Sequence, residues 1–197
     1  MAMPFELPHR AAGVILDWQT GKMTGAAIKQ SRKQLKDLSG IFRDEARRKE
    51  ADQDATIYQV QWWEPAATGS EGGLFWGVTT IFPGRVGDEY FMTQGHFHAN
   101  RTRAEYYGTV QGEGMLVLMD EKRHTWSEPM VPGSLHYIDG RSAHRAVNTG
   151  DTPLIFWACW PTDAGYDYAA IREKGFGARV LSVNGKPALA PSYAENL

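Results

Sequence analysis

Short runs of apolar residues, many of them alternating with polar ones, dominate the chain from residue 56 onward. They are rich in β-branched and aromatic side chains, and Gly, Pro or Asn-Thr-Gly-Asp stretches separate them. Many strands at such short spacing predict an all-β antiparallel sandwich or barrel. The runs that we expect to form strands are TIYQVQWW, LFWGVTTIF, EYFMTQGHFH, EYYGTVQGEGMLVLMD, RHTWSEPM, SLHYID, HRAVNTG and PLIFWACWP.

The pattern differs at the two ends. Residues 26–52 are rich in Lys, Arg, Glu and Ala, which predicts one or two short helices outside the core with a solvated charged face. YAAIREKGF predicts a short helix that ends at Gly175, followed by an extended tail. We see neither an internal repeat nor a linker. We therefore expect one domain, 1–197, divided into an N-terminal extension with short helices (1–52), a β-barrel core (53–165) and a C-terminal helix and tail (166–197).

Composition narrows the class of protein. A chain of 197 residues can bury a core without disulfides, and its formal charge of −2 argues against nucleic acid or an anionic membrane as a partner. The single cysteine, Cys159, lies in the apolar stretch LIFWACWP, so we expect a buried, inert thiol and a reducing compartment. The N-terminal residues show no signal-peptide run, and we expect a soluble, cytoplasmic protein.

Two histidines stand one residue apart in GHFHANRTRAEYYGTVQGEG. In a strand, His96 and His98 point to the same side, and imidazoles on one face can converge on one metal ion. Glu105 opens the next predicted strand after the polar connection ANRTRA, so a hairpin would bring its carboxylate beside the pair. The stretch therefore predicts part of a metal site.

A further ligand has to come from later in the chain. His144, at a turn leading into a strand, is the favoured candidate, and His136 in GSLHYID is its competitor. His124 lies among polar residues and is expected at the surface, and His9 falls in the irregular N-terminus. The alternative for His124 and His136 is an ordinary hydrogen-bonded polar role, which is the usual one for an isolated strand histidine.

These motifs resemble a known superfamily. GHFHANRTRAEYY…GEG followed by GRSAHRAVN resembles the two cupin motifs, and the spacings from Glu105 to Gly112 and from His144 to Asn148 both fit. Two features depart from ordinary cupins: the gap between the histidine pair and the glutamate is longer, and Ile138 stands near the position of an expected proline.

The longer gap, with TTIFPGRVGDEYFMTQGHFHANRTRAEYY and PTDAGYDYAAIREKGF, resembles the cupin-type (archaeal-type) glucose-6-phosphate isomerases over most of the chain. The resemblance implies a cupin double-stranded β-helix, a jelly-roll barrel, with a few short peripheral helices. It also implies a homodimer that interconverts glucose 6-phosphate and fructose 6-phosphate through a metal-bound open-chain sugar.

The resemblance assigns roles to residues of this chain. One divalent ion per subunit is implied, with Fe²⁺ expected and Zn²⁺, Mn²⁺ or Ni²⁺ as alternatives. The implied metal ligands are His96, His98, Glu105 and His144. Glu105 and Tyr107 are the implied catalytic residues. The implied sugar-phosphate contacts are Tyr58, Thr79, Thr93, Gly95, Trp160, Tyr166 and Tyr168.

Several of these positions have a structural alternative or a family departure. Thr79 also suits a strand by propensity alone, and Tyr107 and Tyr168 also suit an aromatic core. The best-known family pattern has tyrosine where this chain has Trp160, and histidine where it has Tyr166.

Strand alternation makes a demand on the local backbone. It places Thr93 and Gly95 on the face opposite His96 and His98, so a bend or bulge near Gly95 is needed to bring both sets to one cavity.

The alternative functions are a cupin Fe(II) dioxygenase, a non-catalytic sugar-binding cupin, or an isomerase of a related sugar phosphate such as mannose 6-phosphate. For the isomerase, proton transfer through a cis-enediol and a hydride shift are both open at this stage.

Overall fold

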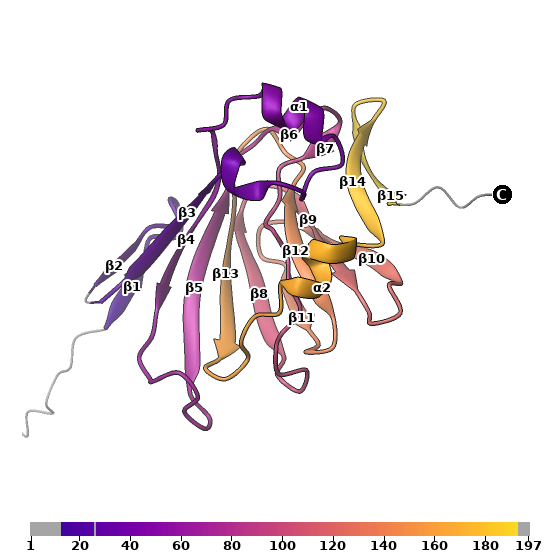
Figure 1. The fold of residues 1–197 in the computed structure, drawn as a ribbon. Helices are drawn as coiled ribbons and strands as arrows, with labels where there is room; N and C mark the ends of the chain where they lie inside the picture. Colours follow the sequence, from indigo (N-terminus) through magenta and orange to yellow (C-terminus); the bar gives the residue numbers. More distant parts are fainter. Residues whose placement is uncertain (1–12, 26, 193–197) are drawn as a thin grey trace, which may run out of the picture.

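The structure, a computed structural model, describes residues 13–25 and 27–192. It is built mostly of strands with a few short helices, as the sequence predicts, and two sheets face each other across the core (Figure 1). His9 and the expectations for residues 1–12 and 193–197 lie outside the described residues.

The larger sheet has six antiparallel strands in the order β11-β8-β13-β5-β4-β3. Residues two apart along these strands face the interior between the two sheets, and the alternate residues face outward. The strands are β3 (Lys29–Gln34), β4 (Thr56–Trp63), β5 (Leu74–Ile81), β8 (Glu105–Gln111), β11 (Leu135–Ile138) and β13 (Leu154–Pro161).

The facing sheet pairs β10 with β9 and β9 with β12, and β12 pairs in turn with an irregular segment through the bridges Met92–Val147 and His96–His144. Four strands of the larger sheet, β5-β13-β8-β11, lie on the other side. Two facing four-stranded sheets in this order form a jelly roll. The predicted double-stranded β-helix is confirmed. The strands here are β9 (Gly114–Met119), β10 (Thr125–Met130) and β12 (Ala143–Asn148).

The remaining elements lie around this barrel. β1 and β2 form a hairpin, and β15-β14-β7-β6 form a small separate sheet. The helix expected to end at Gly175 is present as α2, and Gly175 adopts φ 67° there. The bounds are β1 (Val14–Leu16), β2 (Met23–Gly25), η1 (Leu35–Leu38), α1 (Glu45–Glu50), β6 (Arg85–Val86), β7 (Glu89–Tyr90), α2 (Ala169–Lys174), β14 (Ala178–Val183) and β15 (Lys186–Pro191).

The core lies between the two sheets. Its largest fully buried side chains come from inward positions of strands on both sides, which is the usual consequence of alternation in a sandwich. They include Ile57, Ile81, Leu116, Met119, Met130, Ile138, Leu154 and Phe156.

Two expectations for the chain ends need correction. Residues 29–34 form strand β3 rather than a helix, so the main sheet begins before residue 53. Their Lys, Arg and Gln side chains favour a helix by propensity, but pairing with β4 decides the structure, and charged residues are common on edge strands. The segment expected as an extended tail contributes β15, which pairs with β14 in a hairpin.

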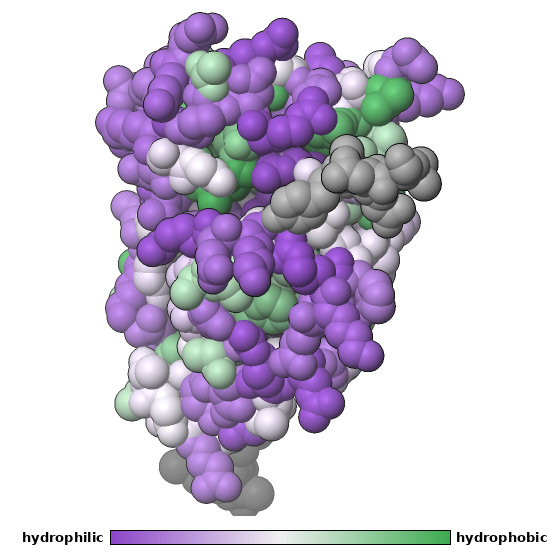
Figure 2. Space-filling view, turned by 45° about the vertical axis from the view of Figure 1, so that its right-hand side comes forward, coloured by the Kyte–Doolittle hydropathy of each residue, from purple (hydrophilic) through white to green (hydrophobic). Residues whose placement is uncertain are grey.

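The outer surface over α2, β10 and β14 is mainly polar, with apolar side chains only in small separate areas (Figure 2). None of the helices within residues 13–25 and 27–192 has the length and hydropathy needed to cross a bilayer.

A buried arginine anchors α1 to the rest of the fold. Arg48 is 4% exposed, donates through Nη1 to the Leu35 carbonyl at 3.0 Å, and forms an ion pair with Glu45 at 2.8 Å. The hydrogen bond from Arg48 lowers the pKa of Glu45 from 4.5 to about 2 despite partial burial. The hydrogen bond from Arg48 to the Leu35 carbonyl thus ties α1 to the 3₁₀ turn, and the ion pair lies within α1.

We expect Glu45→Gln to lower the free energy of unfolding by about 1 kcal/mol at pH 7, a value discounted for the partial exposure of this carboxylate. A depressed folded-state pKa stabilises the protein above the unfolded pKa of 4.5, and this stabilisation is lost as the pH falls towards about 2. Urea denaturation at several pH values would measure the difference. A gap between wild type and variant that stays constant from pH 7 to pH 2.5 would contradict this prediction.

Candidate metal centre

A one-residue bulge shapes the segment that carries the histidine pair. Met92 pairs with Val147 and His96 with His144, so the segment advances four residues while β12 advances three. Gly95 adopts φ 76°, a left-handed conformation that favours glycine, and its Cβ would also collide with the Phe176 ring. The bend expected near Gly95 is confirmed.

The bulge is held by hydrogen bonds on both sides. Thr93 donates its N–H to the Ala146 carbonyl at 2.9 Å, and its hydroxyl accepts the Ala146 N–H at 3.1 Å. Arg145 donates to the Gln94 carbonyl at 2.7 Å. These hydrogen bonds satisfy backbone groups of the bulge. Thr93, Gly95 and His96 can therefore all line one cavity.

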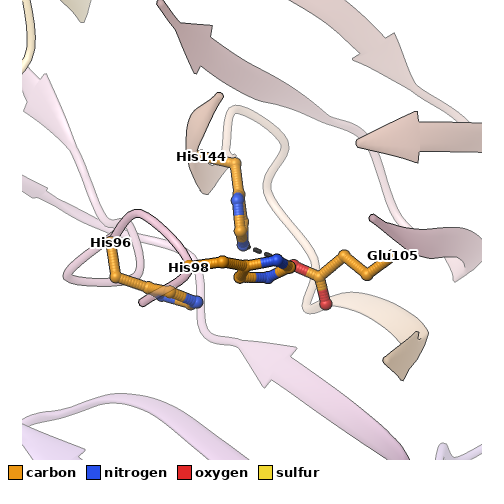
Figure 3. Close-up of side chains that lie close together, drawn as sticks. All are labelled: His96, His98, Glu105 and His144. Carbon is orange, nitrogen blue, oxygen red and sulfur yellow. Dashed lines mark hydrogen bonds and ion pairs between the residues drawn. The ribbon is translucent and has the colours of Figure 1, made fainter. Parts of the chain in front are cut away.

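Four side chains from three parts of the chain meet beside this bulge (Figure 3). His96 and His98 follow Gly95, Glu105 is the first residue of β8, and His144 lies on β12 opposite His96. One ligand atom from each lies within 4.8 Å of the other three. The shortest separation, 2.6 Å, joins His144 Nε2 and Glu105 Oε1, and His98 Nε2 lies 3.1 Å from the same oxygen.

Hydrogen bonds to backbone carbonyls orient two of the imidazoles. His98 Nδ1 contacts the Arg103 carbonyl and His144 Nδ1 lies 3.4 Å from the Ser142 carbonyl. A carbonyl only accepts, so each Nδ1 carries a proton, and each Nε2 faces the centre of the cluster. This is the arrangement that fixes metal-binding histidines in proteins.

The electrostatics of the cluster suit a cation. Burial lowers the pKa of His96 well below its ordinary value, and the neighbouring His144 lowers it further, so this imidazole is neutral at pH 7. Burial would raise the pKa of Glu105, but His144 and His98 outweigh it and hold the carboxyl ionised. A neutral His96 and an ionised Glu105 are the protonation states that ligate metals, whereas Glu105, despite burial, raises the pKa of His98, which loses its Nε2 proton when it binds one.

The residues therefore fit a divalent metal ion. The Nε2 atom of His96 is buried and has no hydrogen-bond partner among the described atoms, and the buried Nε2 of His144 has Glu105 Oε1 beside it at 2.6 Å. Unsatisfied buried nitrogens are costly unless another group uses them, and coordination would use both. Three imidazoles and one carboxylate suit first-row divalent ions.

A cavity of about 280 Å³ opens above the four side chains. Apart from His98, every residue that the sequence assigned to a metal or substrate role lines it: Tyr58, Thr79, Thr93, Gly95, His96, Glu105, Tyr107, His144, Trp160, Tyr166 and Tyr168. The tyrosine assigned a catalytic role, Tyr107, packs edge-on to His144 with ring centroids 5.6 Å apart. Burial and the nearby Glu105 raise the pKa of Tyr107, so its hydroxyl stays protonated.

The loop that follows β13 closes the cavity near His96. Tyr166 and Tyr168 lie with ring centroids 4.8 Å and 5.4 Å from His96 and stack on each other. The ion pair Arg101–Asp167, at 2.8 Å, and the backbone bonds between Phe97 and Asp167 hold this loop in place. The loop is thus fixed to the same segment that carries the histidine pair.

The two positions that depart from the family pattern contact each other. The indole N–H of Trp160 donates a hydrogen bond to the Tyr166 hydroxyl, an interaction that lowers the pKa of Tyr166, although burial raises it by more. Both side chains line the cavity. The two departures therefore form one hydrogen-bonded pair.

The competing candidates lie elsewhere. His136 is buried and hydrogen-bonds to Glu128 at 2.7 Å and to Ser134 at 2.9 Å, and the His124 side chain is exposed, so the ordinary polar role predicted for both is confirmed. Cys159 is half-buried on β13 rather than fully buried, and burial raises the pKa of its thiol. The expectation of a buried cysteine was therefore only partly right.

The sequence interpretation missed Ser31, Lys33 and Gln94, which also line the cavity. Gln94 lies inside the segment already singled out, and its place in the bulge could have drawn attention. Ser31 and Lys33 were assigned to a solvated helix. Every residue of this segment, KQSRKQ, is polar, so no local alternation marked the two positions.

Comparison with known proteins gives a consistent result. A family model described as Glucose-6-phosphate isomerase (GPI) matches residues 32–196. The glucose-6-phosphate isomerase of Pyrococcus horikoshii is 42% identical over 176 residues, which cover 88% of this chain and 91% of that protein. That of Thermococcus litoralis is 41% identical, with 88% and 90% covered.

Solved structures with partial similarity include an oxalate oxidase, with a TM-score of 0.48, 14% identity, and 58% and 56% of the two chains covered. Similarity of that degree supports no conclusion about function. The family model and the sequence relatives span most of the polypeptide, including all four residues of the candidate metal centre. The chain therefore belongs to the glucose-6-phosphate isomerase family.

Proposed function

We propose that this protein interconverts glucose 6-phosphate and fructose 6-phosphate with one divalent metal ion per subunit. The observation that carries the proposal is the convergence of His96, His98, Glu105 and His144 beside one cavity, in a chain of this family. The hydroxyls of Tyr58, Thr79 and Thr93, with the Gly95 backbone, are the proposed contacts for the sugar phosphate.

The proposed chemistry divides between the ion and the protein. A divalent cation held here supplies Lewis acidity to the carbonyl of the open-chain sugar. Both contacts of Glu105 with histidines use Oε1, so Oε2 is the atom that we propose takes the proton from C2 and returns it at C1, while the hydroxyl proton passes from O2 to O1. Tyr107, which stays protonated, donates a hydrogen bond to a substrate oxygen on which negative charge develops.

The finer assignments belong to the same proposal. We propose Fe²⁺ as the physiological ion, with Zn²⁺, Mn²⁺ or Ni²⁺ able to replace it, since the donor set suits each of them. We propose a cytoplasmic location, which the lone cysteine fits.

A homodimer completes the proposal. Tyr106, Leu135 and Tyr137 are 47%, 61% and 55% exposed on neighbouring strands β8 and β11, where a second copy would cover them. Sedimentation equilibrium of the metal-loaded protein would measure this state directly.

The activity test is a coupled assay of the metal-loaded protein with glucose 6-phosphate, fructose 6-phosphate, mannose 6-phosphate and free glucose. We expect turnover of the first two and at most weak activity with free glucose. Oxygen consumption with a small organic substrate would instead indicate a dioxygenase. Sugar binding without turnover, whichever metal is added back, would indicate a non-catalytic cupin.

Replacing one of the four candidate ligands should weaken metal binding without unfolding the protein. We expect His96→Ala to lower metal affinity by at least about a hundredfold. Mutating even the residues that hydrogen-bond to metal ligands lowers metal affinity by about tenfold to a hundredfold. Isomerisation should be lost with the metal, and metal content by plasma emission spectrometry gives the readout. His124→Ala, at an exposed position, is the control. Full turnover of metal-stripped wild-type protein would remove the ion from the mechanism.

The route of the hydrogen can be read from isotope incorporation. If Glu105 Oε2 carries a proton between C2 and C1, isomerisation in D₂O should place deuterium on the product carbon, because a carboxyl proton exchanges with solvent. Nuclear magnetic resonance of the product measures this. Complete retention of the substrate hydrogen over many turnovers would instead indicate a hydride shift.

The phosphate contacts should affect binding more than chemistry. We expect Thr79→Val to raise KM for the sugar phosphate about tenfold with little change in kcat, since it deletes one hydrogen bond to a charged group. Thr80→Val is the matched control, because Thr80 is also buried but does not line the cavity. Equal KM values for the two variants would argue against a phosphate contact at Thr79.

A further inference from the structure

The edge strand β3 forms part of the cavity wall. Ser31 and Lys33, two residues apart, line the cavity, whereas Arg32 between them points to the other side of the sheet. Lys33 pairs with Tyr58 on β4, and Ser31 with Val60. The half-buried Lys33 side chain therefore extends over the face of the sheet that carries Tyr58 and Thr79.

The region next to Lys33 leads directly to the bulge. The Gln94 N–H donates a hydrogen bond to the Tyr58 hydroxyl, so Tyr58 connects β4 to the segment that contains Thr93 and Gly95. Lys33 lies directly across the strand pair from this tyrosine, at the usual cross-strand separation of about 5 Å between Cβ atoms. An ammonium group on a four-carbon stem can reach a ligand bound at the bulge.

Among the described residues that line the cavity, one cationic side chain has no ion-pair partner. Among the described residues that line it, Lys33 is the only lysine or arginine, and Glu105, which contacts two histidines, is the only carboxylate. The nearby Lys29 and Lys36 are held by Glu64 at 2.5 Å and Asp54 at 2.7 Å. Lys33 forms no such ion pair within residues 13–25 and 27–192.

A second positive charge lies behind the bulge. Arg145 is 4% exposed, packs over the Phe176 ring at 4.1 Å, and has no carboxylate within ion-pair distance among the described residues. Its hydrogen bond to the Gln94 carbonyl polarises the Gln94–Gly95 peptide and strengthens the Gly95 N–H as a donor. The bulge end of the cavity is thus positive, and its walls there carry no competing acid.

We propose that Lys33 binds the phosphoryl group of the substrate directly and sets the preference for phosphorylated over neutral sugars. The inference rests on the proposed function, in which the sugar phosphate extends from the metal ligands towards Tyr58 and Gly95. A phosphate carries up to two negative charges, and hydroxyls with one backbone N–H do not neutralise them. Lys33 contacts the part of the substrate that does not react, so it contributes to binding rather than to chemistry.

The experiment compares Lys33→Met with Arg32→Met, which removes the same charge from the same strand on the opposite side of the sheet. For Lys33→Met we expect KM for glucose 6-phosphate to rise about tenfold to a hundredfold, with kcat within about threefold of wild type. We expect Arg32→Met to stay within about twofold of wild type on both constants. Lys33→Arg should restore most of the affinity, because it keeps the charge.

Inorganic phosphate provides a readout that does not depend on turnover. Calorimetric titration of the metal-loaded proteins should show weaker phosphate binding for Lys33→Met and unchanged binding for Arg32→Met, with the difference shrinking at high salt. If the wild type binds phosphate in this way but does not isomerise, the proposed function fails and Lys33 remains a phosphate contact. If the wild type isomerises and all variants share its KM and phosphate affinity, the proposal for Lys33 is overturned.

Thermal melts followed by circular dichroism establish that the variants fold. Should Lys33→Met not fold, Lys33→Gln removes the charge while keeping a polar side chain on the edge strand, and the same two measurements apply. A wild-type protein that binds no phosphate at low salt would also overturn the inference.

Discussion

One extra residue between Met92 and His96 is the constraint on which the site depends. A regular strand would turn Thr93 and Gly95 away from the face that carries His96, because side chains alternate strictly along a strand. The bulge, with Gly95 at φ 76°, brings both sets of groups to one cavity. Nearby groups hold it in place: Thr93 and Arg145 bond to its backbone or across it, and the ring of Phe176 lies against Gly95.

The cluster next to the bulge holds its four side chains close together, although this leaves buried polar atoms unsatisfied and lowers the free energy of unfolding. The Nε2 atom of His96 is buried without a hydrogen-bond partner among the described atoms, that of His144 lies 2.6 Å from Glu105, and Glu105 is ionised within the barrel. Such a group would be destabilising in an apolar core. It persists because the surrounding jelly roll fixes each backbone position, with His144 and Glu105 on opposite sheets. Binding a cation would satisfy these groups, and the binding free energy would add to the free energy of unfolding.

The cavity divides into two chemical regions. The side chains of the candidate metal centre form one region, and the other comprises Lys33 on β3, Tyr58 on β4, Thr79 on β5 and the Thr93–Gly95 bulge. The Trp160–Tyr166 hydrogen bond lies in its wall near His96, where this chain departs from the best-known family pattern. A substrate with a reactive carbonyl at one end and a charged group at the other matches this division. Binding at the charged end can then orient the reacting carbons.

The sequence by itself determined the strand-rich class, because alternation and turn residues are local properties, and its motif spacing carried the resemblance that implied the jelly roll and the four residues of the candidate metal centre. It also predicted that a bend was needed at Gly95, since alternation left no other way to unite the two sets of residues. It failed at residues 29–34, where Lys, Arg and Gln favour a helix and only pairing with β4 imposes a strand. Tertiary structure alone decided that His136 is satisfied by Glu128 and Ser134 while His144 meets Glu105, because only strand pairing sets which side chains lie opposite each other.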